Sequence, residues 1–418
     1  MRPDARPPAY RAVLTKRPFV ALWLGQTVSR FGDTLYDLAL LWYVLDSTGS
    51  ALAAGGIAIA AGGGRLVGSL IAGMLPRYLP ARRIMLIVEL LRCTLTAALG
   101  AGWLLGLTPP LAILYTLACA LALGGALFAP ARLAAIPQLV ARESLVTANA
   151  LDQLSASLVA TLAWGASGAI VALLGPARGL LIDAATFLAS LLAVTWARWS
   201  TDTARDNTAP NPLRALLVGA QWLRDNSLER AILIAQLVQS VAGSAFFVGI
   251  GPHLQRDLGG DATTYGIQGT AYGLALLLGS WLIGRIAVRR VGQLYAAGFI
   301  VNGLGNCGFA LASSLATLLP AAFVAGVGAA AFITGEITLL QANIPATLRG
   351  RVIALTILVT TAVSMVAIAL GGWLADHTQV RTIMLLASLA HIAIGTSLWS
   401  LPRLRRFHLT ADHDDDRS

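Results

Sequence analysis

Recurring apolar runs of about 20 residues constrain this chain most, because an α-helix of about 20 residues crosses a bilayer. Short connections that carry Arg, Gly or Pro separate the runs. Of the 418 residues, 56% are hydrophobic and 12% are charged. A soluble domain carries about 25% charged residues. The pattern therefore predicts an all-α membrane protein with many spans.

We expect twelve membrane-spanning helices, centred near residues 32, 62, 95, 120, 160, 187, 239, 275, 303, 329, 363 and 391. Arginines gather on alternate connections, as at Arg132 and Arg142 after the fourth run and at Arg289 and Arg290 after the eighth. Because basic residues favour the cytoplasmic side, both termini are predicted to face the cytoplasm. The chain is expected in the plasma (inner) membrane as a multi-pass protein.

The longest polar segment divides the spans into two sets of six. We expect a six-helix bundle over residues 1–197, a cytoplasmic linker over 198–230, a second bundle over 231–405 and a disordered tail over 406–418. "GSLIAGMLPRYLPARR" from Gly68 is similar to "GSWLIGRIAVRRVGQL" from Gly279, and Pro137 corresponds to Pro345 at nearly the same offset. The common offset predicts a duplicated bundle with pseudo-two-fold symmetry.

Several classes of activity are excluded by missing residues. Lys16 is the only lysine, so the chain has no phosphate-binding loop of an ATP-driven pump. No GxSxG, no HExxH and no cysteine pair are present, which argues against an enzyme, a metal site or a cofactor. The net charge of +10 is spread between the apolar runs rather than gathered in a basic domain, so no nucleic-acid partner is expected.

Four stretches together resemble the major facilitator superfamily, and within it the drug-efflux branch that includes macrolide exporters and the enterobactin exporter. They are "WLGQTVSRFGDTL" from Trp23, "FAPARLAAIPQLV" from Phe128 with "TANAL" from Thr147, "DAATFLAS" from Asp183, and "NIPATLRGRV" from Asn343. The resemblance covers nearly the whole chain. It implies a secondary transporter that works by alternating access.

The connection between the second and third spans departs from the family pattern. Arg77 stands where the superfamily has an acid that helps to latch the cytoplasmic side, and Arg82 and Arg83 are retained. We therefore expect another group to supply the latch. Arg132, Arg82 and Glu89 are the candidates.

The first span carries a polar stripe of Gln26, Arg30, Asp33 and Asp37. Their spacing of four, three and four places them on one helix face. Each charge at the centre of a membrane helix costs about 2.5–3.5 kcal/mol. Two interpretations follow. Asp33 or Asp37, with Arg30 nearby, binds and releases a proton, or a permanent Arg30–Asp33 pair only gates the helix.

Other ionisable residues inside or beside the spans are interpreted as gating or conformational groups: Arg65, Arg82, Arg83, Glu89, Arg92, Arg132, Asp152, Asp183, Arg349 and Arg351. Glu89 and Arg92 lie three residues apart, which predicts a local structural pair. The second half carries mainly neutral polar groups. The candidates for the substrate cavity are Gln26, Gln236, Gln239, Gln268, Tyr272, Asn302, Asn306, Glu336, Thr360 and His391. His391 fits a helix–helix hydrogen bond better than a proton relay.

The sequence thus predicts proton-coupled export of an amphipathic small molecule, such as an antibiotic or another natural product. A siderophore or metabolite exporter and an uptake transporter of the same fold stay open, with a non-transporting membrane receptor or assembly protein as a more distant alternative. The expected partners are the substrate, protons and membrane lipid, and the expected state is a monomer.

Overall fold

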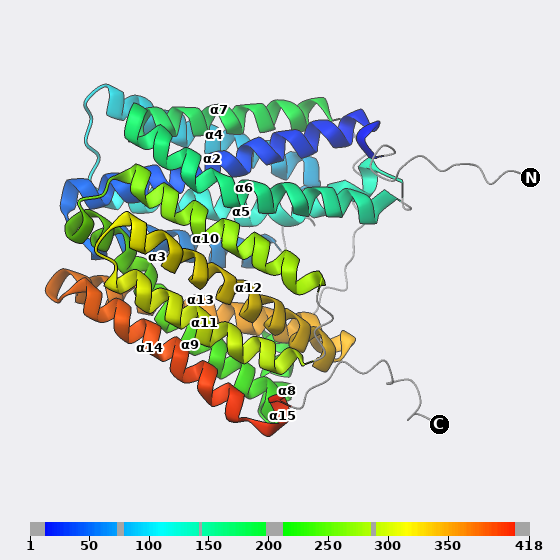
Figure 1. The fold of residues 1–418 in the computed structure, drawn as a ribbon. Coiled ribbons are helices and arrows are strands. Elements are labelled where there is room, and N and C mark those ends of the chain that lie inside the picture. Colours follow the sequence, from blue (N-terminus) through cyan, green and yellow to red (C-terminus); the bar gives the residue numbers. More distant parts are fainter. Residues whose placement is uncertain (1–12, 73–78, 142–143, 198–211, 286–289, 406–418) are drawn as a thin grey trace, which may run out of the picture. The chain divides into compact units, whose positions relative to one another are not determined.

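A computed structural model describes residues 13–72, 79–141, 144–197, 212–285 and 290–405, and these ranges are helical with no β-strand (Figure 1). The helices of the first part are α2 (Arg17–Thr48), α3 (Ala51–Ala72), α4 (Ala81–Leu104), α5 (Leu111–Leu139), α6 (Leu145–Leu174) and α7 (Pro176–Trp196). They are followed by α8 (Pro212–Asp225), α9 (Ser227–Pro252), the π-helical turn η3 (His253–Asp257), α10 (Ala262–Arg285), α11 (Val291–Leu311), α12 (Leu315–Asn343), α13 (Ala346–His377), α14 (Val380–Ser400) and α15 (Pro402–Arg405).

Eleven helices in the described ranges are long and apolar enough to cross a membrane. α2 is not among them, because Arg30, Asp33 and Asp37 interrupt its apolar sequence. Its 32 residues nevertheless give it a length of about 48 Å at about 1.5 Å per residue. That α2, the helix with the polar stripe, also crosses the membrane and brings the number of spans to twelve therefore stays a prediction.

Glycine and proline set the tight connections between neighbouring helices. Gly49 ends α2 with φ 63°, and its N–H donates to the carbonyl of Leu45 at 2.8 Å. Gly175, with φ 79°, separates α6 from α7, and Pro176 begins α7. A positive φ is accessible to glycine without a Cβ clash, and proline is pre-shaped for a first helical turn.

The described chain forms two units. The first holds α2–α7 and Asp261–Ile267 at the start of α10, and the second holds α8, α9 and the elements from Gln268 onward. α8 falls within the range predicted as a linker, but it packs on α13, where Gly219 approaches Arg351 and Leu223 contacts Val352. The remaining bundle boundaries stay predictions. Arg77, Arg142, Arg289, the linker residues 198–211 and the tail 406–418 lie outside the described residues.

The order of neighbours within one unit is repeated within the other. In the first unit α2 packs on α6 and α7, α4 packs on α5 and α7, and α3 packs on α5. In the second unit α9 packs on α13 and α14, and α11 packs on α12 and α14. α10 packs on α12, where Gly326 meets the backbone of Tyr272. These five pairs of the first unit thus have counterparts six spans later, as a duplication would produce.

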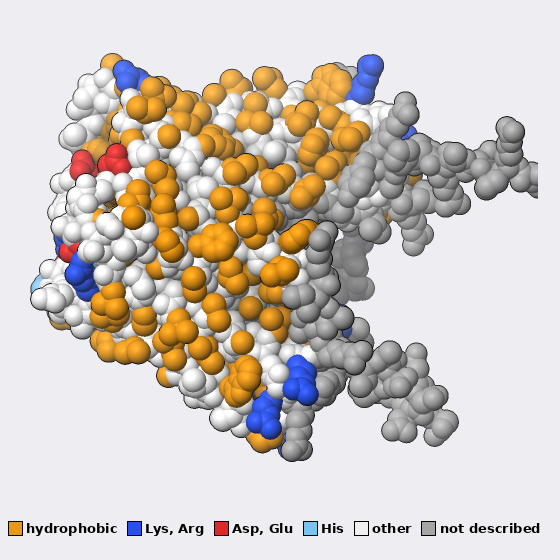
Figure 2. All heavy atoms as spheres, viewed as in Figure 1, with side chains coloured by type: hydrophobic (Ala, Val, Ile, Leu, Met, Phe, Trp, Pro, Cys, Tyr) orange, Lys and Arg blue, Asp and Glu red, His pale blue; other side chains and the backbone are white. Residues whose placement is uncertain are grey.

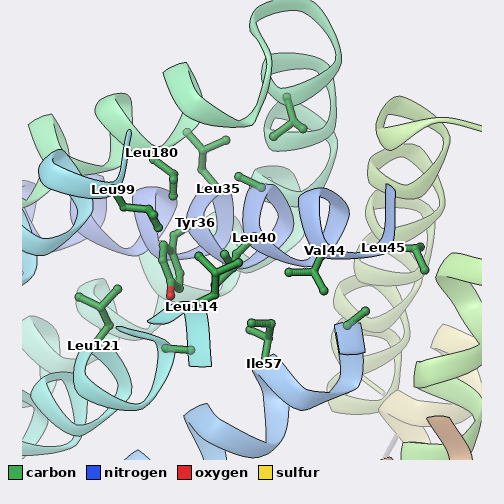
Figure 3. Close-up of a cluster of buried hydrophobic side chains, with 14 of the residues drawn as sticks. Leu35, Tyr36, Leu40, Val44, Leu45, Ile57, Leu99, Leu114, Leu121 and Leu180 are labelled. Atoms are coloured by element: carbon green, nitrogen blue, oxygen red, sulfur yellow. The ribbon is translucent and has the colours of Figure 1, made fainter. Parts of the chain in front are cut away.

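An apolar cluster holds the second half of α2 in place (Figure 3). Leu35, Leu40 and Val44 of α2 form one buried cluster with Leu114 of α5 and Leu180 of α7. Many large hydrophobic side chains are also exposed on the helices. On the face drawn in Figure 2, hydrophobic side chains are spread along the helices, and the visible charged ones lie toward the helix ends. This distribution suits helices that are surrounded by lipid.

Candidate functional site

The polar stripe of α2 does not face one direction only. Gln26 Nε2 donates to Glu89 Oε1 of α4 at 3.2 Å and to Ser190 Oγ of α7 at 2.6 Å. Arg30 reaches Asp152 of α6. Asp33 pairs with Arg92 of α4. The first three residues of the stripe thus reach three different helices. The fourth, Asp37, lines a pocket.

Arg30 and Arg132 share the carboxylate of Asp152. Arg30 Nη2 lies 2.8 Å from Asp152 Oδ1, and Arg132 Nη1 of α5 lies 2.6 Å from Asp152 Oδ2. The Arg30–Asp33 pair considered from the sequence is therefore not formed, because a carboxylate on α6 is closer to Arg30 than the one on its own helix. Arg132 is paired with a carboxylate, as is required if another group replaces the missing acid of the cytoplasmic latch.

The Arg92 guanidinium pairs with Asp33 and lies 4.1 Å from the ring centroid of Phe187. The predicted local pair between Glu89 and Arg92 is wrong. Glu89 Oε1 instead accepts hydrogen bonds from Gln26 and, at 2.7 Å, from Ser190 Oγ. The spacing along α4 allowed the pair, but Glu89 bonds to side chains of α2 and α7, and Arg92 bonds to Asp33 of α2.

Two further carboxyl groups surround Arg92. Glu89 and Asp183 are both 0% exposed, and together with Asp33 they are the acids that act on the Arg92 charge. Oε2 of Glu89 and Oδ2 of Asp183 have no hydrogen-bond partner among the described residues. One arginine therefore stands among three carboxyl groups, two of them sealed from solvent. We call Asp33, Glu89, Arg92 and Asp183 the carboxyl cluster.

Gly32 lets α7 approach α2 at this cluster. A Cβ on Gly32 would collide with Thr186 Oγ1 and Asp183 Oδ1. The Thr186 hydroxyl donates to the carbonyl of Asp183 at 2.7 Å. Thr186 and Ser190 were missed in the sequence. Their spacing of three and seven residues after Asp183 places all three on one face of α7, and this pattern could have revealed them.

A pocket with a volume of about 740 Å³ opens beside the cluster within the first unit. Asp33, Asp37 and Arg92 line it, together with Arg65 of α3 and several alanines of α5. Asp37 and Arg65 are exposed to the pocket. Known small-molecule sites occupy about 300–1,000 Å³, so the volume is suitable for a drug-sized compound.

The polar candidates of the second unit mostly bond to each other. Gln236 Nε2 donates to Glu336 Oε1 at 2.6 Å, and His391 bonds to Gln239. Asn306 Nδ2 donates to Asn302 Oδ1 at 3.1 Å, and Asn302 Nδ2 donates to the Ala325 carbonyl at 2.9 Å. Thr360 donates to the Thr356 carbonyl within α13, Gln268 is buried and Tyr272 is half-buried. Contact with a substrate stays a prediction for all of them.

The remaining predicted residues lie near helix ends. Arg82 donates to the carbonyls of Val194 and Thr195 in the last turn of α7. Arg83 is exposed. Arg349 donates to the Ile344 carbonyl and Arg351 is half-buried. The described ranges contain no group of three or more His, Cys, Asp or Glu that could hold a metal ion.

Comparison with known proteins agrees with this architecture. The profile of the transmembrane secretion effector family matches residues 9–416. The multidrug efflux pump Tap of Mycolicibacterium fortuitum is 27% identical, over 95% of this chain and 99% of that protein. The uncharacterized MFS-type transporter y4rN of Sinorhizobium fredii is 24% identical, over 94% and 97%.

Solved structures show the same fold at low identity. A peptide transporter POT superposes with a TM-score of 0.72 at 14% identity, over 93% of this chain and 95% of that one. A bacterial homologue of the iron transporter ferroportin, in its inward-facing state, gives a TM-score of 0.65 at 19% identity, over 92% and 99%. The match to the family profile covers nearly the whole chain and confirms the predicted transporter rather than an enzyme. The chain belongs to the transmembrane secretion effector family of the major facilitator superfamily and is a multi-pass membrane transporter.

Proposed function

We propose that this transporter exports an amphipathic small molecule in exchange for protons. In this proposal two six-helix bundles, residues 1–197 and 231–405, alternate access to the substrate within a monomer whose termini both face the cytoplasm. The relative Tap is a multidrug efflux pump, and this similarity supports the proposed direction of transport and class of substrate.

The carboxyl cluster is the observation that carries proton coupling. If all three acids were ionised, Arg92 would balance only one of the three negative charges. Glu89 and Asp183 are fully buried, each with one oxygen that lacks a partner. Buried charges are tolerated when they are paired, so a cluster with surplus carboxyl groups is a place where protons bind.

Asp33 is the acid that connects this cluster to the pocket. It lines the pocket and pairs with Arg92, while Glu89 and Asp183 lie behind it. Protonation of Asp33 would remove the charge that holds Arg92 and free the guanidinium to turn toward Glu89 or Asp183. That exchange of partners would loosen α2 from α4 and favour one conformation over another. Loss of the proton would reverse it.

The test is substrate-driven proton movement in proteoliposomes, with wild type, Asp33→Asn and Glu229→Gln. Glu229 is a buried acid of the second unit in the first turn of α9, and its amide variant is the matched control. We expect Asp33→Asn to lose at least about 90% of coupled proton movement, a tenfold loss that corresponds to about 1.4 kcal/mol. Glu229→Gln should retain coupling.

Asp33→Glu separates coupling from folding, because it keeps a titrating carboxyl group while changing its reach. Partial recovery of proton movement in Asp33→Glu supports the proposal. If Asp33→Asn exchanges substrate for protons at the wild-type rate, Asp33 is only a structural partner of Arg92 and the proposal is wrong.

A further inference from the structure

The pocket of the first unit holds two oppositely charged side chains that form no direct bond with a described residue. Asp37 on α2 and Arg65 on α3 line it and are exposed to it. Neither side chain forms a hydrogen bond or an ion pair with a residue in the described ranges, and they do not pair with each other. The other charges on the wall, Asp33 and Arg92, are already paired. The pocket thus presents one free carboxylate and one free guanidinium.

Two unpaired charges in a membrane helix bundle are costly. Each is unfavourable by about 2.5–3.5 kcal/mol at the centre of a membrane helix, so such residues commonly face a water-filled path or a ligand. Two other arginines inside the same unit, Arg30 and Arg132, bind Asp152. Arg65 has no such carboxylate, and a ligand with two charges would satisfy both Arg65 and Asp37.

The wall between these charges is apolar and built of small side chains. Ala61 of α3 and Ala118, Ala122, Gly125 and Ala126 of α5 line it. A Cβ on Gly125 would meet no atom within 4 Å, which shows open space at that point. Small side chains leave the volume of about 740 Å³ free for the body of a ligand.

Tyr36 adds a second polar feature to this wall. It is 7% exposed and lines the pocket, and its hydroxyl oxygen has no hydrogen-bond partner among the described residues. Tyr36 and Leu114 of α5 belong to the same buried cluster, which Figure 3 shows. An unsatisfied buried hydroxyl costs about 1–3 kcal/mol, so a ligand atom that bonded it would contribute to binding.

We propose that the substrate class of this pocket is a zwitterionic amphiphile, and this inference rests on the transport function proposed above. A cationic group of the substrate binds Asp37, an anionic group binds Arg65, and the apolar body lies against the alanines of α3 and α5. A purely cationic compound leaves Arg65 unpaired, and a purely anionic one leaves Asp37 unpaired. Only a molecule that carries both charges satisfies both side chains.

Four dansyl probes with one fluorescent body and one linker test this assignment. Nε-dansyl-lysine carries an ammonium and a carboxylate, dansylcadaverine an ammonium only, N-dansyl-6-aminohexanoate a carboxylate only, and N-butyl dansylamide neither. Binding is measured by fluorescence with the full chain in lipid nanodiscs and no ion gradient. A charge-assisted hydrogen bond contributes about 1.5–3 kcal/mol, so the wild type should bind dansyl-lysine at least about 10-fold more tightly than each other probe.

Single variants then assign each charge. Asp37→Asn should weaken the two ammonium probes about 10-fold and leave the carboxylate-only probe unchanged or tighter. Arg65→Gln should do the reverse. Asp225→Asn and Arg178→Gln remove exposed charges outside the pocket and are the matched controls. Thermal melting and gel filtration confirm that each variant is folded.

Three results would overturn the inference: equal affinity of the wild type for dansyl-lysine and a singly charged probe, equal losses for all four probes in both pocket variants, or no binding of any probe by the wild type. Proton movement in proteoliposomes distinguishes the two proposals. Charge-selective binding of dansyl-lysine without proton movement contradicts the coupling alone. Proton movement driven by dansylcadaverine, without a preference for dansyl-lysine, contradicts the zwitterion alone.

Discussion

Between the helices of the first unit the polar groups are mostly charged, whereas between those of the second they are mostly neutral. Asp152 joins three helices through two arginines, and Asp33 joins α2 to α4 through Arg92. In the second unit Asn302, which also accepts a hydrogen bond from Asn306 of the same helix, connects α11 with α12, and Gln239 connects α9 with His391 of α14. Its ion pairs, such as Arg381 with Asp257, lie at the ends of helices instead.

The two kinds of contact between helices respond differently to protons. Protonation of an acid in an ion pair removes a charge and the attraction that depends on it. An amide between helices does not titrate, so its hydrogen bond persists as the proton gradient changes. In our proposal the first unit therefore responds to protons and the second supplies a stable frame. The repeated order of helix neighbours makes this a comparison of two similar scaffolds with different polar contents.

The largest effect on stability is expected from Asp152→Ala. It leaves Arg30 and Arg132 without a carboxylate in a partly buried position, and breaking such a pair costs about 3 kcal/mol. Thermal melting and SDS titration of the purified protein measure the loss. A triple variant with Asp152, Arg30 and Arg132 all changed to apolar residues should recover most of it. If Asp152→Ala melts like the wild type, the charged network is not what binds α2, α5 and α6 together.

Gly32→Ala probes the close approach of α7 to α2. The new methyl group would collide with Thr186 and Asp183, so we expect a loss of about 2 kcal/mol in the free energy of unfolding. Gly125→Ala is the control in the same unit, because its Cβ would meet open space and alanine favours the helix. Equal melting temperatures for the two variants would show that the close approach at Gly32 is relaxed in the membrane protein.

Asn302→Ala tests the neutral network of the second unit. It removes the bond to the Ala325 carbonyl and the acceptor for Asn306, and helix–helix hydrogen bonds in membranes contribute about 0.6 to 1.7 kcal/mol each. We expect a loss of about 1 kcal/mol. Proton movement per substrate exported should stay at the wild-type value. A change in that ratio would break the distinction between the two units.

Asp261→Ala should have the smallest effect, because this exposed residue lies outside the candidate spans at the start of α10. A hydrogen bond from the backbone N–H of Thr264 to Asp261 Oδ1, at 2.9 Å, lowers the pKa of the carboxyl. The hydrogen bond stabilises the folded protein by about 0.3 kcal/mol after solvent screening. This stabilisation is present above the pKa that Asp261 has in the unfolded chain, about 3.9, and it is lost as pH falls through the lower pKa of the folded protein. The two proteins should therefore differ at neutral pH and converge in acid, as followed by thermal melting across pH. A difference that grows in acid would contradict the assignment.

The sequence by itself determined the class of the protein and the place of its polar residues along each helix. Apolar runs of membrane-spanning length must fold as helices, because backbone N–H and C=O groups in lipid have to form hydrogen bonds within their own segment. Spacing placed Gln26, Arg30, Asp33 and Asp37 on adjoining turns of one helix. Four stretches spread over the chain were enough to indicate the superfamily, which the family profile confirms.

Only the tertiary structure decided which charges are partners. Spacing favoured Arg30 with Asp33 and Glu89 with Arg92, but neither pair is formed. The direction of a side chain on its own helix follows from a period of about 3.6 residues, whereas its partner depends on which helix packs opposite and at what height. α2 packs on α6 and α7, and α4 packs on α7. This packing brought Asp33 to Arg92 and Arg30 to Asp152, and it left Asp37 and Arg65 facing the pocket, where neither forms an ion pair with a described residue.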